Sequence, residues 1–105
     1  MRRAVIVLGS AEDDIASLSA YFQLEAGDEL GSRFRACCRE AVASLAEFPE
    51  RGALFLERRP GLRQLRRLPV PGFDSLMLFY RVTPAAVEIA RVLDARMDLS
   101  REVFD

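Results

Sequence analysis

The strongest constraint on the fold is a run of apolar residues at helical spacing between Asp28 and Phe48. The pattern ends at Phe48-Pro49, because the residue before a proline disfavours the helical conformation. We therefore predict a long amphipathic helix that starts at Asp28 and stops at Phe48. Its apolar residues recur at intervals of three, four or seven and are Leu30, Phe34, Cys37 or Cys38, Ala41, Leu45 and Phe48.

A second amphipathic helix is predicted just before this one. Ser10 has the character of an N-cap, and the acids at residues 12–14 suit a helix N-terminus, which carries a partial positive charge. Gly27 ends the helix, since glycine readily adopts the left-handed conformation. Its apolar stripe consists of Ile15, Leu18 and Phe22, flanked by Tyr21.

The rest of the chain predicts strands. Residues 3–8 are rich in valine and isoleucine, and their continuous apolar run predicts a strand covered on both faces. Three further strands are expected at residues 62–70, 76–82 and 86–93, with the second of them central. Turns at Pro60-Gly61, Pro71-Gly72 and Thr83-Pro84 separate them.

The order of these elements predicts one α+β domain covering residues 1–105. Strand, helix, helix and three strands follow one another, and the short connections between the later strands imply antiparallel neighbours. We expect the two helices to form a hairpin on one face of a small antiparallel sheet. The apolar residues of the tail could add a final turn of helix; they are Met97, Leu99, Val103 and Phe104.

Composition excludes several kinds of active site. The chain has no histidine, so a Ser-His-Asp triad, a Cys-His dyad and a histidine-ligated metal are all ruled out. Its two cysteines, Cys37 and Cys38, are adjacent, which suits neither a disulfide nor a zinc site. We expect one buried thiol with a second beside it, and we expect no metal and no cofactor. No membrane-length apolar run and no signal peptide are present, so a cytoplasmic location is expected.

The charges are unevenly distributed along the chain. All fifteen basic residues are arginine, and six of them fall within residues 51–70, whereas residues 10–30 hold six acids and no arginine. Arginine presents a planar donor fork that suits carboxylate and phosphate groups. The basic segment is therefore either a solvated strand face that deters edge pairing or a binding surface.

Ordered segments along nearly the whole chain resemble ParE-type toxins of the RelE/ParE superfamily. In the first half these segments are Ala11 to Ile15, Tyr21-Phe22, Phe34 and Leu45 to Gly52. In the second half they are Leu62-Arg63, Arg67 to Val70, Phe73, Leu78 to Val82 and Ile89 to Asp98. One departure is Asp94, which stands where the family commonly has a histidine after the Arg-Val-Leu of the last strand.

The resemblance implies the toxin of a type II toxin–antitoxin pair. Such a protein would inhibit DNA gyrase without being an enzyme, and an antitoxin, ParD-like or another DNA-binding protein, would neutralise it. Neither membrane binding nor sequence-specific DNA binding by the toxin alone is expected. Two alternatives stay open: a RelE-like ribosome-dependent messenger RNA endoribonuclease, and a degenerate member that only binds its antitoxin. Against the nuclease, Phe104 lacks a hydroxyl at the terminal aromatic position, and Met77 stands where such nucleases carry a strand arginine.

The same resemblance suggests two sets of site residues. The arginines could contact the target, although Arg81 could equally pair with Glu88 across a hairpin. The apolar helix residues could be covered by the antitoxin, although packing between hairpin and sheet explains them as well. The target-binding candidates are Arg63, Arg66, Arg67, Arg81 and Arg96, and the antitoxin-binding candidates are Ile15, Leu18, Phe22 and Phe34.

Overall fold

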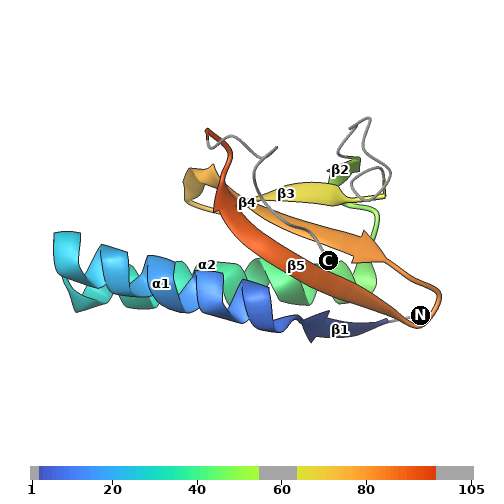
Figure 1. The fold of residues 1–105 in the computed structure, drawn as a ribbon, viewed down its shortest axis with the longest axis horizontal. Coiled ribbons are helices and arrows are strands. Elements are labelled where there is room, and N and C mark those ends of the chain that lie inside the picture. The colour runs from blue at the N-terminus through green and yellow to red at the C-terminus, as the bar shows by residue number, and fades with distance from the viewer. Residues whose placement is uncertain (1–2, 55–63, 97–105) are drawn as a thin grey trace.

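Helices and strands form two layers in the described part of the chain. The computed structural model describes residues 3–54 and 64–96. The predicted α+β class is confirmed, with one helical layer against one sheet (Figure 1). The strands are β1 (Ala4–Val7), β2 (Ala53–Leu54), β3 (Arg66–Val70), β4 (Phe73–Val82) and β5 (Ala86–Asp94), and the helices are α1 (Gly9–Ala26) and α2 (Asp28–Glu47).

The sheet has the strand order β1-β5-β4-β3-β2, so β4 is central, as predicted. Strands β3, β4 and β5 are antiparallel neighbours, but β1 runs parallel to β5. The sheet is therefore mixed, where an antiparallel sheet was expected. Short turns set the direction of consecutive strands, whereas β1 and β5 are separated by most of the chain and no turn relates them.

Strand β1 lies at the edge of the sheet, and the prediction that both of its faces are covered is wrong. Val5 and Val7 are half-buried, whereas Ala4 is exposed and Ile6 remains 47% exposed. The strand reads Ala-Val-Ile-Val. Because every residue is apolar, its pattern could not indicate which face the rest of the protein leaves open.

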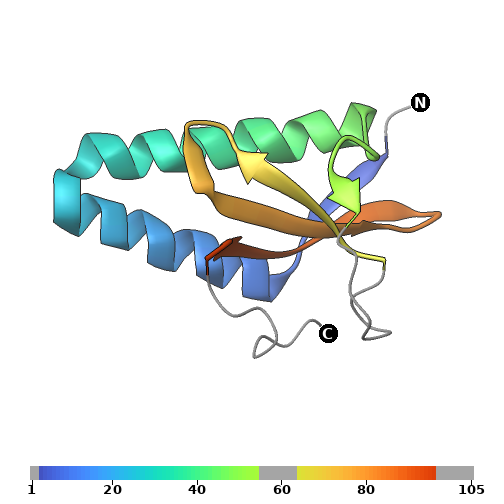
Figure 2. The same cartoon turned by 90° about the horizontal axis from the view of Figure 1, so that it is seen from above.

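The two helices form the predicted hairpin at Gly27, whose φ of 97° is a backbone conformation that glycine adopts at little cost. The start of α2 at Asp28 and its C-cap at Phe48 are also confirmed. Figure 2 shows the helices side by side, with the Gly27 end of the hairpin extending beyond the sheet. The predicted N-cap is wrong, because α1 begins at Gly9, and the Ser10 hydroxyl instead donates to the Ala90 carbonyl oxygen at 2.8 Å.

An ion pair attaches α1 to β5. The Asp14 carboxylate accepts hydrogen bonds from Arg91 Nε at 2.7 Å and Nη2 at 3.0 Å, and from the Val92 N–H at 2.9 Å. The carboxylates of the predicted acidic helix start are thus not equivalent. Asp14 has a tertiary role that neither its position in the helix nor its neighbours in sequence indicated.

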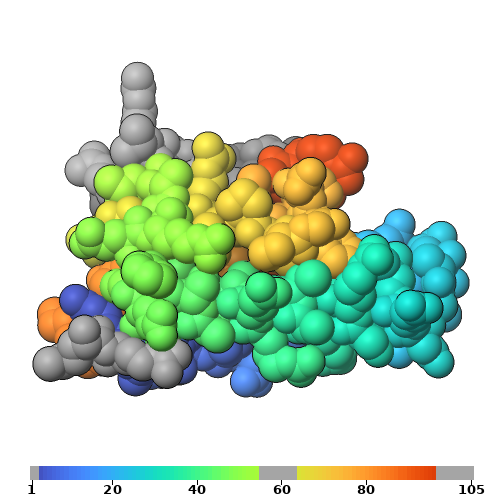
Figure 3. Space-filling model, turned by 180° about the vertical axis from the view of Figure 1, so that it is seen from behind, coloured from blue at the N-terminus to red at the C-terminus, as the bar shows by residue number. Residues whose placement is uncertain are grey.

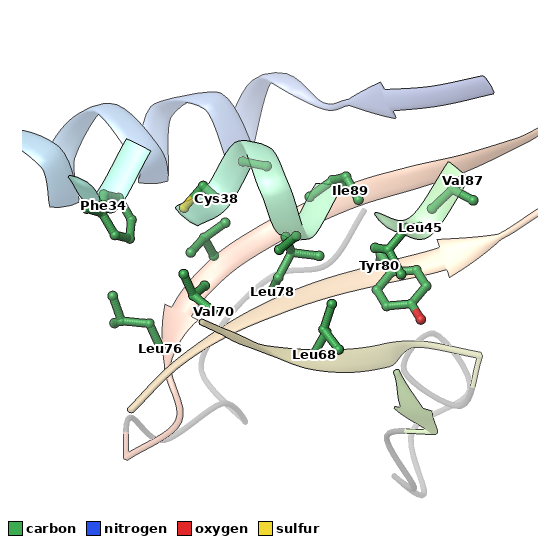
Figure 4. Packing of buried hydrophobic residues seen from close by; sticks show 13 residues of the cluster. Phe34, Cys38, Leu45, Leu68, Val70, Leu76, Leu78, Tyr80, Val87 and Ile89 are labelled. Carbon is green, nitrogen blue, oxygen red and sulfur yellow. The ribbon is translucent and has the colours of Figure 1, made fainter. Parts of the chain in front are cut away.

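The hairpin buries one face of the sheet. Core side chains from α2 recur at helical spacing, as predicted, but Phe48 is 63% exposed and does not extend that stripe. Cys38 is buried and Cys37 is half-buried, as expected for the adjacent thiols. Figure 4 shows the α2 residues Phe34, Cys38 and Leu45 together with the strand residues of the core, which are Leu68, Val70, Leu76, Leu78, Tyr80, Val87 and Ile89.

The strands of the second half differ in extent from those predicted. Strand β3 begins at Arg66, and residues 62 and 63 of the predicted strand lie outside the described residues. The pairing of β3 with β4 shifts register between Pro69 and Val70. The two-residue strand β2 was not predicted. The proposed helical turn in the tail lies outside the described residues.

Candidate functional site

A hydrogen-bond network holds the chain segment that leaves α2. The Tyr80 hydroxyl donates to the Pro49 carbonyl oxygen at 2.8 Å and accepts from the Gly52 N–H at 2.8 Å. Burial raises the pKa of the Tyr80 phenol, so this group stays protonated at neutral pH and remains a donor. The network therefore anchors residues 49–52 to the central strand of the sheet.

Arg66 completes this network from β3. Its Nη1 donates to the Gly52 carbonyl oxygen at 2.7 Å and to the Glu50 carbonyl oxygen at 3.3 Å. The half-buried Arg66 therefore bonds to the backbone of its own molecule. These bonds explain the position of its side chain, and no second protein is needed to explain it. This target-binding candidate has a structural role that the basic character of the segment did not indicate.

Arg67 points to the opposite face of the sheet, because successive side chains of a strand alternate between faces. It is exposed and pairs in register with Phe79 of β4. Arg81 follows Phe79 by two positions, so both arginines lie on the sheet face away from the hairpin. Arg81 is also opposite Glu88 in register, as the hairpin alternative predicted. Arg63 lies outside the described residues.

Arg96 lies apart from these two arginines. It follows β5, whose last residue, Asp94, pairs with Leu76, whereas Arg81 is five residues further along β4. At about 3.3 Å per residue, the separation along the strand is roughly 17 Å. The Arg96 side chain donates to Asp94 from Nη2 at 2.7 Å and Nε at 3.0 Å. The predicted arginines therefore do not converge on one point.

An open cleft of about 430 Å³ lies between the segment after α2 and strands β3 and β4. Figure 3 shows this segment, in light green, against β3, in yellow. Arg51 and Arg67 are the charged residues among its described lining, so we call it the Arg51–Arg67 cleft. Its lining consists of Arg51, Gly52, Ala53, Arg67, Leu68, Pro69 and Met77.

The apolar candidates belong mainly to the packing between hairpin and sheet. Phe34 is completely buried, so an antitoxin cannot reach it in this conformation, and its assignment as a contact residue is corrected to core. Phe22 is partly buried, with its ring centroid 5.2 Å from that of Phe34 and 5.1 Å from that of Phe73. Ile15 and Leu18 are half-buried. This set thus divides into one core residue and three at its margin.

Ile15 also lines a groove of about 160 Å³ on the hairpin. Arg35 stands at this groove, where its Nε donates to the Ser19 hydroxyl at 2.9 Å. The groove combines apolar and basic groups at the surface. Its residues are Val7, Ile15, Arg35, Cys38, Arg39 and Val42.

Besides Ile6 on β1, the described residues include further exposed apolar side chains that were not among the predicted site residues. Leu24 is 88% exposed near the Gly27 end of the hairpin, Phe48 is 63% exposed, and Leu54 on β2 is 50% exposed. Helical periodicity placed Phe48 in the core, whereas Leu24 lies outside the predicted stripe of Ile15, Leu18 and Phe22. Single exposed apolar side chains are normal on protein surfaces, so these residues alone do not mark a site.

The described residues offer little for catalysis. Burial, more than the neighbouring Cys37, raises the pKa of the Cys38 thiol to about 11, so it is not a nucleophile at neutral pH. Within residues 3–54 and 64–96, no three acidic or cysteine side chains are grouped as metal ligands. Neither described helix is long and apolar enough to cross a membrane.

Comparison with known proteins gives one family and one fold. The family model described as the ParE toxin of the type II toxin–antitoxin system parDE matches residues 5–99. No curated protein sequence matches the chain. The chromosomal ParDE toxin–antitoxin system of P. aeruginosa contains a chain with a similar fold, with a TM-score of 0.73 and 18% identity over 89% of this chain and 96% of that one.

A second solved structure with the same fold is the E. coli DinJ-YafQ toxin–antitoxin complex. Its TM-score is 0.57 at 13% identity, over 90% of this chain and 93% of that one. At such identities the two structures support the architecture described above. They do not carry over the roles of individual residues.

Proposed function

Because the chain belongs to the ParE toxin family of type II toxin–antitoxin systems, we propose that it inhibits DNA gyrase by binding and is neutralised by a cognate antitoxin. The family match over residues 5–99 is the observation that carries the proposal. Gyrase acts in the cytoplasm, so we expect the protein to work there.

The proposed mode of action is binding without catalysis. A hydrolase or nuclease needs a group that moves a proton near the reacting bond. The chain has no histidine, the Tyr80 phenol is occupied by Pro49 and Gly52, and the Cys38 thiol is protonated at neutral pH. The arginines of the sheet are therefore better suited to docking. Arg67 and Arg81, on the sheet face away from the hairpin, are the proposed target contacts, with Arg63 and Arg96 as further candidates.

The antitoxin is proposed to cover the hairpin groove that Val7, Ile15 and Val42 line. An amphipathic partner helix would bury these side chains, which are half-buried in the chain alone. Leu18 and Phe22 lie on the same helix as Ile15 and are proposed as neighbouring contacts. A ParD-like or other DNA-binding antitoxin with an acidic and apolar segment would match the groove and its two arginines, Arg35 and Arg39.

Gyrase supercoiling by purified components tests the target. We expect the protein to inhibit supercoiling, and its expression to halt division and induce the DNA-damage response. The variant Arg67→Ala should lose inhibition, whereas Arg33→Ala, which removes an equal charge from α2, should retain it. Equal melting temperatures would show that both variants are folded. Unchanged supercoiling at micromolar protein would refute gyrase as the target.

Two other outcomes distinguish the alternative functions. Transcript ends that accumulate within codons after induction would identify a ribosome-dependent endoribonuclease. Harmless expression without any antitoxin, from a protein that is folded, would identify a degenerate member that only binds its antitoxin.

A further inference from the structure

We propose that Arg35 and Arg39 form a charge-selective site beside the hairpin groove. The site would bind a partner helix that carries two carboxylates four residues apart next to an apolar stripe, and it would disfavour a helix with basic residues at those positions. It rests on the proposed function, because the partner helix is that of the antitoxin. It adds the spacing of the charges that such a helix must carry. Both charged residues in the described lining of the groove are arginines.

The two arginines are neighbours on the surface of α2. They lie four positions apart in this helix, so their side chains project from the same face. With a rise of 1.5 Å per residue, they are separated by roughly 6 Å along the helix axis. Two carboxylates four positions apart in a partner helix have the same separation, so each carboxylate can meet one guanidinium group.

Helix α2 does not compensate the charge of this pair. Like charges four positions apart repel each other and destabilise a helix, whereas an acid three or four positions away would stabilise it. No acid occupies such a position, since the residues there are Gly31, Ser32, Ala36, Cys38, Val42 and Ala43. Within residues 3–54 and 64–96, neither Arg35 nor Arg39 forms an ion pair. A partner with two carboxylates would therefore relieve a repulsion that the chain alone retains.

Arg35 is oriented before any partner arrives. Its Nε donates to the Ser19 hydroxyl at 2.9 Å, and Ser19 is a buried residue of α1. This bond engages Nε and leaves the terminal nitrogens of the guanidinium to face a carboxylate, which they bind through charge-assisted hydrogen bonds. A side chain that is already ordered loses less conformational entropy on binding.

The apolar part of the groove favours a protein helix as the partner. Val7 of β1, Ile15 of α1 and Val42 of α2 are half-buried and contribute aliphatic surface. The volume of about 160 Å³ is below the roughly 300–1,000 Å³ of small-molecule sites, so the groove suits the side chains of a helix. A phosphate backbone could engage the arginines but would leave this aliphatic surface uncovered.

The experiment is a titration of the methyl-labelled protein followed by NMR. The probe is a synthetic amphipathic peptide of about 18 residues, long enough to form a helix, with a leucine stripe and two glutamates four positions apart beside it. We expect saturable shifts of the methyl groups of Val7, Ile15 and Val42. The methyl groups of Leu54 should not shift, because β2 is at the opposite end of the sheet order from β1.

Two further peptides separate spacing from charge. In the first, the same glutamates stand two positions apart, so the net charge is equal but the carboxylates point to different faces of the helix. We expect it to bind three- to tenfold more weakly, as for the loss of one charge-assisted contact, with the weaker value typical of exposed pairs. In the second, lysines replace the glutamates, and we expect the weakest binding of the three.

Variants of the protein test each arginine. Arg35→Ala and Arg39→Ala should each weaken binding of the probe about three- to tenfold, whereas Arg33→Ala, which removes an equal charge from the same helix, should not. Arg39→Glu should reverse the preference toward the lysine peptide. The melting temperature of Arg39→Ala should equal or slightly exceed that of the unchanged protein, because the substitution removes a repulsion. A residue with a purely structural role would lower it.

Failure of this site and failure of the proposed function give different results. Equal affinity for the three peptides at the groove would overturn the charge-selective site and keep the groove as the proposed antitoxin surface. Absence of shifts at Val7, Ile15 and Val42 would overturn both, and gyrase inhibition is measured independently of either. Tighter binding of an oligothymidylate at the same methyl groups, or shifts there that depend on protein concentration without peptide, would also overturn the site, in favour of a nucleic acid or a second copy of the chain.

Discussion

The Tyr80 hydroxyl donates a hydrogen bond to the carbonyl oxygen of Pro49 at 2.8 Å, across 31 positions of sequence. Tyr80 lies on the central strand of the sheet, and Pro49 follows the C-cap of α2. The bond therefore joins the two layers at the point where the chain passes from one to the other. It also sets the wall of the Arg51–Arg67 cleft, through the second bond of the same hydroxyl to Gly52.

Removing this hydroxyl should destabilise the fold. In Tyr80→Phe, the buried N–H of Gly52 loses its acceptor, and the expected loss in the free energy of unfolding is about 1–3 kcal/mol. Urea denaturation followed by circular dichroism measures it. Tyr21→Phe is the matched control, because Tyr21 is 56% exposed and should change stability little. Equal stability of the two variants would contradict the role assigned to Tyr80.

Gly52 should not tolerate a side chain. A Cβ atom there would lie 2.6 Å from the Tyr80 hydroxyl oxygen and 2.8 Å from the Arg67 carbonyl oxygen. We expect Gly52→Ala to lower the free energy of unfolding by roughly 1–3 kcal/mol through this crowding. The same substitution at Gly9, where nothing lies within 4 Å, should be neutral or slightly stabilising. Thermal denaturation of both variants would compare them, and a neutral Gly52→Ala would disprove the close approach.

The Asp14 carboxylate should contribute more to stability than its neighbour Asp13. Asp14→Ala removes two hydrogen bonds from Arg91 and one from the Val92 N–H. Both side chains of the ion pair are largely buried, with 18% of Arg91 and 14% of Asp14 exposed. We expect a loss of roughly 1.5–3 kcal/mol, as for hydrogen bonds to a charged group.

The control for that measurement is Asp13→Ala. Asp13 is exposed near the start of α1 and should contribute only about 0.3–1 kcal/mol through the helix dipole. Chemical denaturation of both variants gives the difference. If Asp13→Ala cost as much as Asp14→Ala, the acids would act through the helix terminus alone, as the sequence suggested.

Asp94 should titrate at unusually low pH. Hydrogen bonds from the Arg96 side chain, and then from its backbone N–H, lower the pKa of the Asp94 carboxyl from 3.8 to about 2. Because the pKa in the folded state lies below its unfolded value, this pair stabilises the protein above about pH 4 and loses that effect as the pH falls toward 2. In Arg96→Ala the midpoint should move back toward 3.8. Carboxyl ¹³C NMR measures it, and an unchanged midpoint would show that Arg96 does not hold the carboxylate.

Much of the helical layer could be predicted from local pattern. The apolar residues from Leu30 to Leu45, with Pro49 beyond them, were enough to predict the extent of α2. Gly27 was enough to predict the hairpin turn. Helix geometry and termini depend on residues within a few positions of one another, so the sequence carries that information directly. The turns at Pro71-Gly72 and Thr83-Pro84 likewise set β3, β4 and β5 antiparallel.

The candidate site could be predicted only as a basic region. Sequence placed Arg66 and Arg67 in one segment, but a strand sends neighbouring side chains to opposite faces. Arg66 therefore reaches the backbone of Gly52, whereas Arg67 lines a cleft with Arg51 and Met77. No sequence pattern indicated the cleft, because its residues come from three segments that only folding brings together.

The sequence by itself thus determined the order of the elements other than β2, the hairpin turn at Gly27, the extent of α2, the α+β class and the absence of histidine chemistry. Only the tertiary structure decided that β1 is an exposed parallel edge, that Phe34 is core while Phe48 is exposed, and which arginine is structural. The physical reason is the distance along the sequence between the residues that decide each property. Local conformation depends on neighbours in the chain, whereas burial and hydrogen-bond partners depend on residues such as Pro49 and Tyr80, which become neighbours only in the folded protein.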